Sequence, residues 1–317
     1  MPSVKIFAIA ALAAAASAMP SSLRLTERQL RYHELAKRQN GAAQQMGLTD
    51  PDILQFALTL EHLEDTFYRQ GFAQFPDTDF AALGLTPVQI ADLKQIGATE
   101  SQHVGLLQSA LAQSNVQPVQ ACTYSFGFTD AAGMVATAAI LENVGVSAYL
   151  AAAPLIADPA ILGTAGSILT IEARHQSSIR VFSNQVAVPT AFDAPLSPRA
   201  VFTLASPFIV SCPEGSNLAI EAFPSLAMAE GQVQPTAIGT SLRVTSQAAN
   251  IATNCAFTTG GVLPGGTKFS AFSEAEGCLV PQGVAGITYV TLTNSAPING
   301  AISDDIIVAG PMAVTIT

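Results

Sequence analysis

Residues 168–179 read ILTIEARHQSSI, and in this stretch Glu172 is followed three positions later by His175. The apolar residues around them have the three- and four-residue spacing of a helix with a buried face. Two residues that are three apart on a helix lie on the same side, one turn above the other. Burying a carboxylate beside an imidazole costs free energy unless another group pairs with them. The stretch therefore predicts a helix whose buried face carries a polar site.

The same pair of residues occurs a second time in the chain. ATESQHVGLL at 98–107 places Glu100 and His103 at the same spacing, and only three histidines lie beyond residue 38. One Glu-x-x-His alone is better explained by a surface pair that stabilises a helix by a few tenths of a kcal/mol. Because two of the three histidines follow a glutamate in this way, the doubled motif points to a shared site.

Helical periodicity extends from about Asp50 to Gln185 and falls into four segments of roughly 20–28 residues. Asp or Thr followed by Pro marks the start of several of them, as an N-cap followed by the first helical position. The connection at 115–128 has no helical period, yet it is long enough to run the length of a bundle. The pattern predicts a four-helix bundle with one crossover, with helices at 50–70, 86–114, 129–153 and 158–185.

The first and third helices supply two more carboxylates. Glu61 and Glu142 each follow a leucine, and Tyr68 and Tyr149 come seven residues later, two turns along the same face. The first two helices and the last two thus form a weak internal repeat. Counted from the helix ends, one level of the bundle collects six polar side chains, namely Glu61, Glu100, His103, Glu142, Glu172 and His175. Four negative charges cannot stay unpaired in an apolar core, and two divalent metal ions would balance them.

One Glu from each of two helices, with a Glu-x-x-His from each of the others, is the ligand pattern of ferritin-like di-iron carboxylate proteins. The phrases DPDILQFALTLEHLE, LENVGVSAYLAAAP, ILTIEARHQ and FDAPLSPRAVFTLASPF resemble the ferritin-like group of plant desiccation-related proteins and fungal stress-response or late-sexual-development proteins. The resemblance covers roughly residues 45–212. It implies that the six residues bind two iron ions; manganese would also suit these ligands, and zinc suits them less.

Five further residues lie close to the predicted ligands in the sequence. Tyr68 and Tyr149 are expected to be core aromatics that hold a hydrogen bond, or catalytic relays of the kind that similar tyrosines in ferritin-like oxidases suggest. Glu64, one turn beyond the first ligand, is expected to be solvated or to lie behind the ligands. His62 lies off the ligand face and is expected to be exposed. Arg174 is expected to pair with an acid on the helix surface.

From about Phe192 the sequence pattern changes. Residues 191–212 are rich in proline, with room for one short helix after Ser197. Short alternating runs such as GITYVTLTN follow in 213–317, separated by Gly-rich turns. The fold class is therefore α+β: a ferritin-like bundle at 39–190, a linker at 191–212 and a small antiparallel β-sandwich at 213–317. This β-region has no histidine, and we expect it to bind a cell wall or mediate oligomerisation.

The first 38 residues have the composition of export signals. Residues 1–18 carry Lys5, an apolar run and a small-x-small cleavage site, which favours a secretory signal peptide; the alternative is an N-terminal anchor helix, for which the run is short. Residues 19–38 end in a Lys-Arg pair, as a propeptide would, although a polar leader that stays attached fits as well. The expected location is extracellular or in a cell wall.

The net charge limits the classes of binding partner, and the cysteines indicate disulfides. Removing 1–38 takes away six basic and two acidic residues and leaves 7 basic against 21 acidic, a net charge of −14. Such a chain has no electrostatic reason to bind nucleic acid or an anionic membrane. Four cysteines in an exported chain indicate two disulfides with three connectivities. We favour Cys255 with Cys278, which share the C-terminal region, leaving Cys122 with Cys212.

The function expected from these features is ferroxidase activity, or the handling of peroxide or dioxygen, in stress or development. A non-catalytic wall or surface protein with a structural metal site is the main alternative. A third hypothesis is an oxidase that acts on an organic substrate. Such an enzyme would need an apolar channel that leads to the metals.

Overall fold

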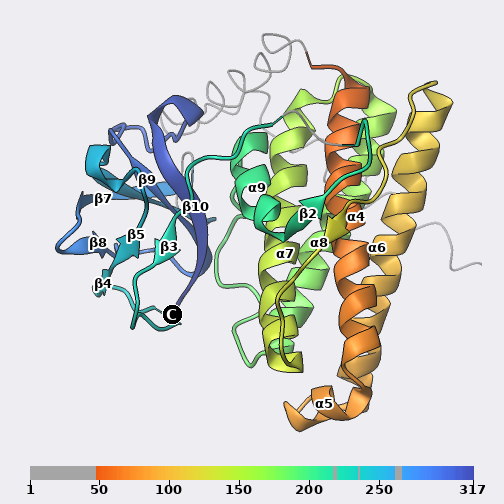
Figure 1. Ribbon diagram of the computed structural model, residues 1–317, viewed down its shortest axis with the longest axis horizontal. Helices are drawn as coiled ribbons and strands as arrows, with labels where there is room; N and C mark the ends of the chain where they lie inside the picture. The colour runs from red at the N-terminus through yellow and green to blue at the C-terminus, as the bar shows by residue number, and fades with distance from the viewer. Residues whose placement is uncertain (1–47, 217–219, 235, 261–265) are drawn as a thin grey trace, which may run out of the picture. The chain divides into compact units, whose positions relative to one another are not determined.

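The helix starts predicted from capping residues and prolines are present in the structure, a computed structural model that describes residues 48–216, 220–234, 236–260 and 266–317 (Figure 1). The Thr86 side chain accepts a hydrogen bond from the N–H of Gln89, and the Asp158 side chain accepts from two N–H groups of the next turn. The four long helices of the described residues are α4 (Asp50–Gln74), α6 (Pro87–Gln113), α7 (Ala131–Ala152) and α8 (Pro159–Phe182). The predicted helical bundle is therefore confirmed.

The connections set the order of the bundle. The short helix α5 (Asp77–Ala82) lies in the first connection, where the sequence indicated only a linking stretch. Residues 115–128 run back along the bundle, so that α6 ends and α7 begins at opposite ends of it (Figure 1). Within this crossover, β1 (Thr123–Tyr124) pairs with β2 (Ile209–Ser211), which follows α9 (Pro198–Ala205).

The second half of the chain folds as a curled six-stranded antiparallel sheet with the order β10-β9-β6-β7-β8-β4. This is the antiparallel β-region that the sequence predicts, with one half-barrel-like sheet and a small two-stranded pair, β3–β5, instead of two equal sheets. The strands are β3 (Ala227–Met228), β4 (Ser241–Leu242), β5 (Val244–Thr245), β6 (Asn254–Thr258), β7 (Thr267–Ser273), β8 (Gly277–Leu279), β9 (Gly286–Thr293) and β10 (Ile307–Ile316). Short 3-10 turns lie at Ala153–Leu155, Ser206–Phe208, Ala249–Ile251 and Asp304–Ile306.

Strand β9 joins the two halves because both of its faces are covered. All eight of its residues are buried. Ile287 and Tyr289 belong to the apolar core that includes the helices, whereas Val290 and Leu292 belong to the core of the β-region. The Tyr289 hydroxyl also donates a 2.9 Å hydrogen bond to the carbonyl of Asn143 on α7.

Two disulfides connect the cysteines in the favoured pairing. Cys122 at the crossover is bonded to Cys212 after β2, with Cα atoms 4.2 Å apart, and Cys255 on β6 is bonded to Cys278 on β8. Both disulfides indicate that the chain matures in an oxidising compartment. The predicted signal peptide (1–18) and propeptide (19–38) lie outside the described residues.

One helical stretch in the described part of the chain, Ala131–Leu155, is long and apolar enough to cross a membrane. Length and composition are weak evidence on their own, and 67% of its most apolar window is buried within the fold. This is the burial expected for the most central helix of a bundle.

Candidate metal centre

The six predicted ligand residues converge at one level of the bundle. All four carboxylates are fully buried at 0% exposure, while the two imidazoles retain 8% and 6%. Glu61 is on α4, Glu100 and His103 are on α6, Glu142 is on α7, and Glu172 and His175 are on α8. The equal heights expected from the sequence therefore place these side chains in one buried cluster, called the Glu/His cluster below.

The Glu/His cluster consists of two overlapping groups. One contains Glu61, Glu100, His103 and Glu172, and the other contains Glu100, Glu142, Glu172 and His175. In each group, one potential ligand atom per residue lies within 4.8 Å of all the others. Glu100 and Glu172 belong to both groups. Two shared carboxylates, with one further Glu and one His at each side, form an arrangement that is consistent with a dinuclear metal site.

The imidazole of His103 faces three carboxylates. Its Nδ1 atom lies 2.9 Å from Glu100, 3.2 Å from Glu172 and 3.3 Å from Glu61. Such convergence of one ring nitrogen on three acidic side chains, inside an apolar bundle, is stable only if a proton or a cation lies between them.

The imidazole of His175 repeats the arrangement and adds a feature that the sequence did not reveal. Its Nδ1 atom lies 2.9 Å from Glu100 and 3.1 Å from Glu142. On the other side of the ring, Nε2 lies 3.0 Å from the Thr99 hydroxyl, which itself donates to the carbonyl of Ile96 at 2.6 Å. The Thr99 oxygen therefore accepts from Nε2–H, which leaves Nδ1 free to face the cluster, as a metal-binding histidine requires.

Burial sets the protonation of the carboxyl groups in the metal-free protein. It raises the pKa of Glu61 to about 7, although the hydrogen bond with His103 acts in the opposite direction. The pKa of Glu172 is raised well above the usual carboxyl range, by burial and then by the charge of Glu100. Burial also raises the pKa of Glu142. Without a cation, burial therefore favours the protonated form of these carboxyl groups.

The imidazoles hold protons more firmly than usual. Burial alone would lower the pKa of His103, but hydrogen bonds with Glu100 and two other carboxylates raise it to about 12. Burial is likewise outweighed at His175, where the same kind of bonds raise the pKa to about 10. Burial acts to raise the pKa of Glu100, yet its hydrogen bonds with both imidazoles bring that pKa below its usual value. In the metal-free state, protonated imidazoles thus offset part of the negative charge that cations would balance.

An imidazole Nδ1 lies 2.9–3.3 Å from three buried oxygens of the cluster, yet no well-aligned hydrogen bond within the described residues satisfies these three or a fourth. The four oxygens are Glu61 Oε2, Glu100 Oε1 and both carboxylate oxygens of Glu172. A buried polar atom without a partner costs roughly 1–3 kcal/mol, and more when it is charged. Carboxylate oxygens with two imidazole nitrogens are ligands that suit iron or manganese. The donor set therefore fits a pair of metal ions.

The two tyrosines of the internal repeat bind the cluster reciprocally. Tyr68 on α4 donates its hydroxyl proton to Glu142 on α7, and Tyr149 on α7 donates to Glu61 on α4. Burial is the main cause that raises the pKa of both phenols. The structure therefore shows both as buried aromatics that each hold a hydrogen bond, and a relay role stays a prediction.

Two neighbouring residues, His62 and Arg174, differ from expectation, and Glu64 meets one of its two alternatives, a place behind the ligands. His62 is not exposed: its exposure is 6%, and its Nε2 lies 3.1 Å from the carbonyl of Val119, because the crossover covers this face of α4. Glu64 is not solvated either, with 4% exposure. Arg174 donates to the carbonyl of Thr170 at 3.1 Å and has no acid partner among the described residues.

Glu64 lies beside the cluster because Gly145 leaves space for it. A Cβ at Gly145 would be 2.8 Å from Glu172 Oε2 and 3.1 Å from Glu64 Oε1. In the internal repeat, the glycine occupies the position equivalent to Glu64 itself. Burial, and then the charge of Glu172, raise the pKa of Glu64 well above its usual value. The sequence signal that could have found this pairing is the replacement of one repeat position by glycine.

The match to a protein family agrees with this geometry. Residues 49–185 match the family described as ferritin-like domain. Protein rds1 of Schizosaccharomyces pombe is 25% identical over 178 residues, which are 56% of this chain and 44% of that protein. The match thus spans less than half the length of this curated relative. A solved structure, a conserved hypothetical protein from Mycobacterium tuberculosis, aligns with 47% of this chain and 93% of its own at 20% identity and a TM-score of 0.34. Four long helices, the crossover and the family match together show that residues 49–185 are a ferritin-like domain.

Proposed function

We propose that the ferritin-like domain holds two redox-active metal ions of one kind, with iron favoured and manganese as the alternative. The domain would use this metal pair to oxidise ferrous ion with dioxygen or peroxide. The observation that carries this proposal is the pair of overlapping ligand groups that share Glu100 and Glu172. Carboxylates that belong to both groups would help to hold two cations near each other.

In this proposal each residue has a distinct task. Glu100 and Glu172, which belong to both ligand groups, would help to hold both ions, while one Glu and one His would complete each group: Glu61 with His103, and Glu142 with His175. Four carboxylates balance the charge of two divalent ions, which allows neutral imidazoles. Bound iron supplies one-electron chemistry toward dioxygen or peroxide. The Tyr68 hydroxyl donates a hydrogen bond to Glu142, and the Tyr149 hydroxyl donates one to Glu61. These hydrogen bonds orient the two carboxylates that belong to one ligand group each.

The proposed location and biological role rest on the sequence and the disulfides. Two disulfides fit an exported protein, and the resemblance to stress-response and desiccation-related proteins suggests that it handles iron or peroxide outside the cell during stress or development. The β-region carries none of the candidate ligands. Within the proposal, it attaches the protein to a cell wall or mediates assembly.

A second candidate is a non-catalytic surface protein in which the metal is structural. The observation in its favour is the complete burial of all four carboxylates, because closed sites are typical of structural metals. The two candidates share the metal and differ in whether dioxygen or peroxide reacts there.

Metal content and oxygen uptake separate the two candidates. The purified protein should carry two ions per chain by elemental analysis and consume dioxygen above background when ferrous ion is added. The double variant Glu100→Ala/His103→Ala should lose both properties. The control Ser101→Ala/Gln102→Ala changes two exposed residues of the same helical turn and should keep them. Unchanged metal content in the first variant contradicts the proposal, and bound metal without oxygen uptake supports the structural role.

A further inference from the structure

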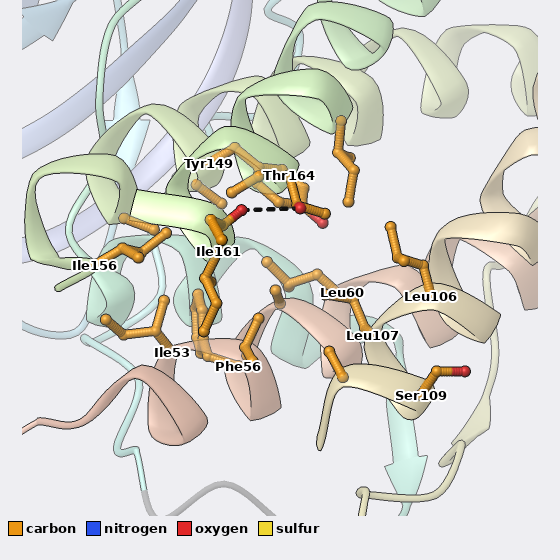
Figure 2. A pocket seen from close by; sticks show the side chains of 18 of the residues that line it. Ile53, Phe56, Leu60, Leu106, Leu107, Ser109, Tyr149, Ile156, Ile161 and Thr164 are labelled. Atoms are coloured by element: carbon orange, nitrogen blue, oxygen red, sulfur yellow. Dashed lines mark hydrogen bonds between the residues drawn. The ribbon is translucent and has the colours of Figure 1, made fainter. Parts of the chain in front are cut away.

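Four helices enclose an apolar cavity of about 250 Å³ at the end of the bundle where α4 begins. Figure 2 shows Ile53, Phe56 and Leu60 from α4, Leu106 and Leu107 from α6, and Ile161 from α8 around it. No charged side chain is among the described residues that line it. The lining is thus uncharged and mostly apolar, in contrast to the Glu/His cluster deeper in the bundle.

The cavity is hollow because alanines stand where a bundle normally places larger residues. Ala57, Ala110, Ala148, Ala152 and Ala165 contribute to its walls, with at least one from each of the four helices. Protein interiors are close-packed, and each unfilled volume in an apolar core costs stability. An open volume of this size is therefore a feature that an occupant would stabilise.

The inner end of the cavity lies next to the Glu/His cluster. Tyr149, which is 8% exposed, lines the cavity and donates its hydroxyl proton to Glu61. One side chain therefore separates the apolar space from a candidate metal ligand. The outer residues Ser109 and Gln113 on α6 and Thr164 on α8 are exposed, so the mouth lies between these two helices.

We propose that this cavity is a binding site for an uncharged apolar organic molecule, which lies against Tyr149 beside the metal centre. An apolar cavity of about 150 Å³ is large enough to bind benzene, so the present one has room for a molecule of roughly ten carbon atoms. The lining itself would supply the affinity, so binding goes beyond the proposed function and does not depend on the metal.

A peptide segment, from this chain or another, is a poorer occupant. An entering backbone would bring N–H and C=O groups that need partners. The side chains that line the cavity offer few, chiefly those of Ser109, Gln113 and Thr164 at the mouth. An ion is a poorer occupant still, because nothing in the lining compensates its charge. A neutral apolar molecule needs neither.

Naphthalene, titrated against the purified full-length protein, tests this site by its fluorescence. We expect saturable binding of one molecule per chain. The variant Ala110→Phe places a ring in the cavity and should weaken binding by roughly tenfold or more. Its matched control is Ala112→Phe, because Ala112 is on the same helix but exposed and outside the lining. A second filling variant, Ala165→Phe, approaches from α8 and covers the case in which the first does not fold.

The outcomes decide the matter in either direction. Binding by the unmodified protein and by Ala112→Phe, with loss in the folded filling variants, supports the site. An absence of saturable binding to the unmodified protein overturns it, and that is also the result expected if a chain segment already fills the cavity. Equal binding by all variants overturns it too. Because metal content is measured separately on the same samples, failure of this site and failure of the metal centre remain distinguishable.

Discussion

The two ends of the bundle bury equivalent tyrosines in different surroundings. Tyr68 is 1% exposed, packs edge-on against Phe67 at 5.1 Å between ring centroids and stacks on Phe72 at 5.9 Å. Tyr149 stands at the floor of the alanine-lined cavity instead. Both donate a hydrogen bond to a carboxylate of the opposite half. The internal repeat therefore preserves the ligands and has diverged in what lies outside them.

This difference separates two requirements of a buried ionic site. The ligand geometry depends on residues at fixed helical spacing, which both halves keep. Access depends on packing, and there the halves diverge: one end is closed by aromatic rings, and the other is open to a small molecule. If this division is correct, substitutions at the ligands should act equally in both halves, and substitutions around the tyrosines should not.

The largest effect is expected at the shared carboxylates. Glu172→Gln should reduce bound metal from two ions to none, because Glu172 belongs to both ligand groups. Glu61→Gln and Glu142→Gln each affect one group and should both leave one ion. Elemental analysis of the purified variants measures this, with the exposed Glu214→Gln as control. Unequal losses at Glu61 and Glu142 would show that the two halves are not equivalent even at the ligands.

The packing difference should be visible in stability. Phe67→Ala at the closed end removes a fully buried ring that contacts three other aromatic rings, so it should lower the free energy of unfolding by about 3–5 kcal/mol. Leu107→Ala, buried at 3% but facing the cavity, should cost nearer 2 kcal/mol, because part of its surface already lacks packing partners. Denaturant unfolding compares the two. A cost at Leu107 equal to that at Phe67 would mean that the cavity is filled in solution.

A smaller effect is expected where the glycine of the second half makes room for Glu64. Gly145→Ala would put a methyl group 2.8 Å from Glu172 and should weaken metal binding by roughly tenfold through displacement of that ligand. Gly105→Ala is the matched control, since nothing lies within 4 Å of a Cβ there, and it should stabilise α6 by roughly 0.5–1 kcal/mol. A competition assay with a chelator gives the metal affinities. Equal affinities in the two variants would show that Glu172 tolerates the added methyl group.

Much of the centre could be predicted because helical geometry converts sequence spacing into spatial position. The offsets of Glu61 and Glu100 from their helix ends were enough to place both at one height. The burial of His62 could not be predicted, because it depends on where the aperiodic crossover lies. The cavity could not be predicted from the sequence either. An alanine in a helical pattern is compatible with close packing or with empty space, and only the distances between the helices decide which of the two occurs.

The smallest expected difference, and the most direct comparison of the two ends, concerns the tyrosine hydroxyls. Tyr68→Phe leaves a Glu142 oxygen without its donor behind closed aromatic packing, where the loss should cost about 1–3 kcal/mol of stability. Tyr149→Phe leaves Glu61 in the same position, but water can enter from the cavity and replace the hydroxyl, so the cost should be about 1 kcal/mol less. Chemical unfolding of both variants in the metal-free state measures the difference. Saturating naphthalene should remove this difference in stability, because an apolar ligand excludes the water that replaces the hydroxyl in Tyr149→Phe. If the difference persists with naphthalene bound, the ligand does not reach Tyr149.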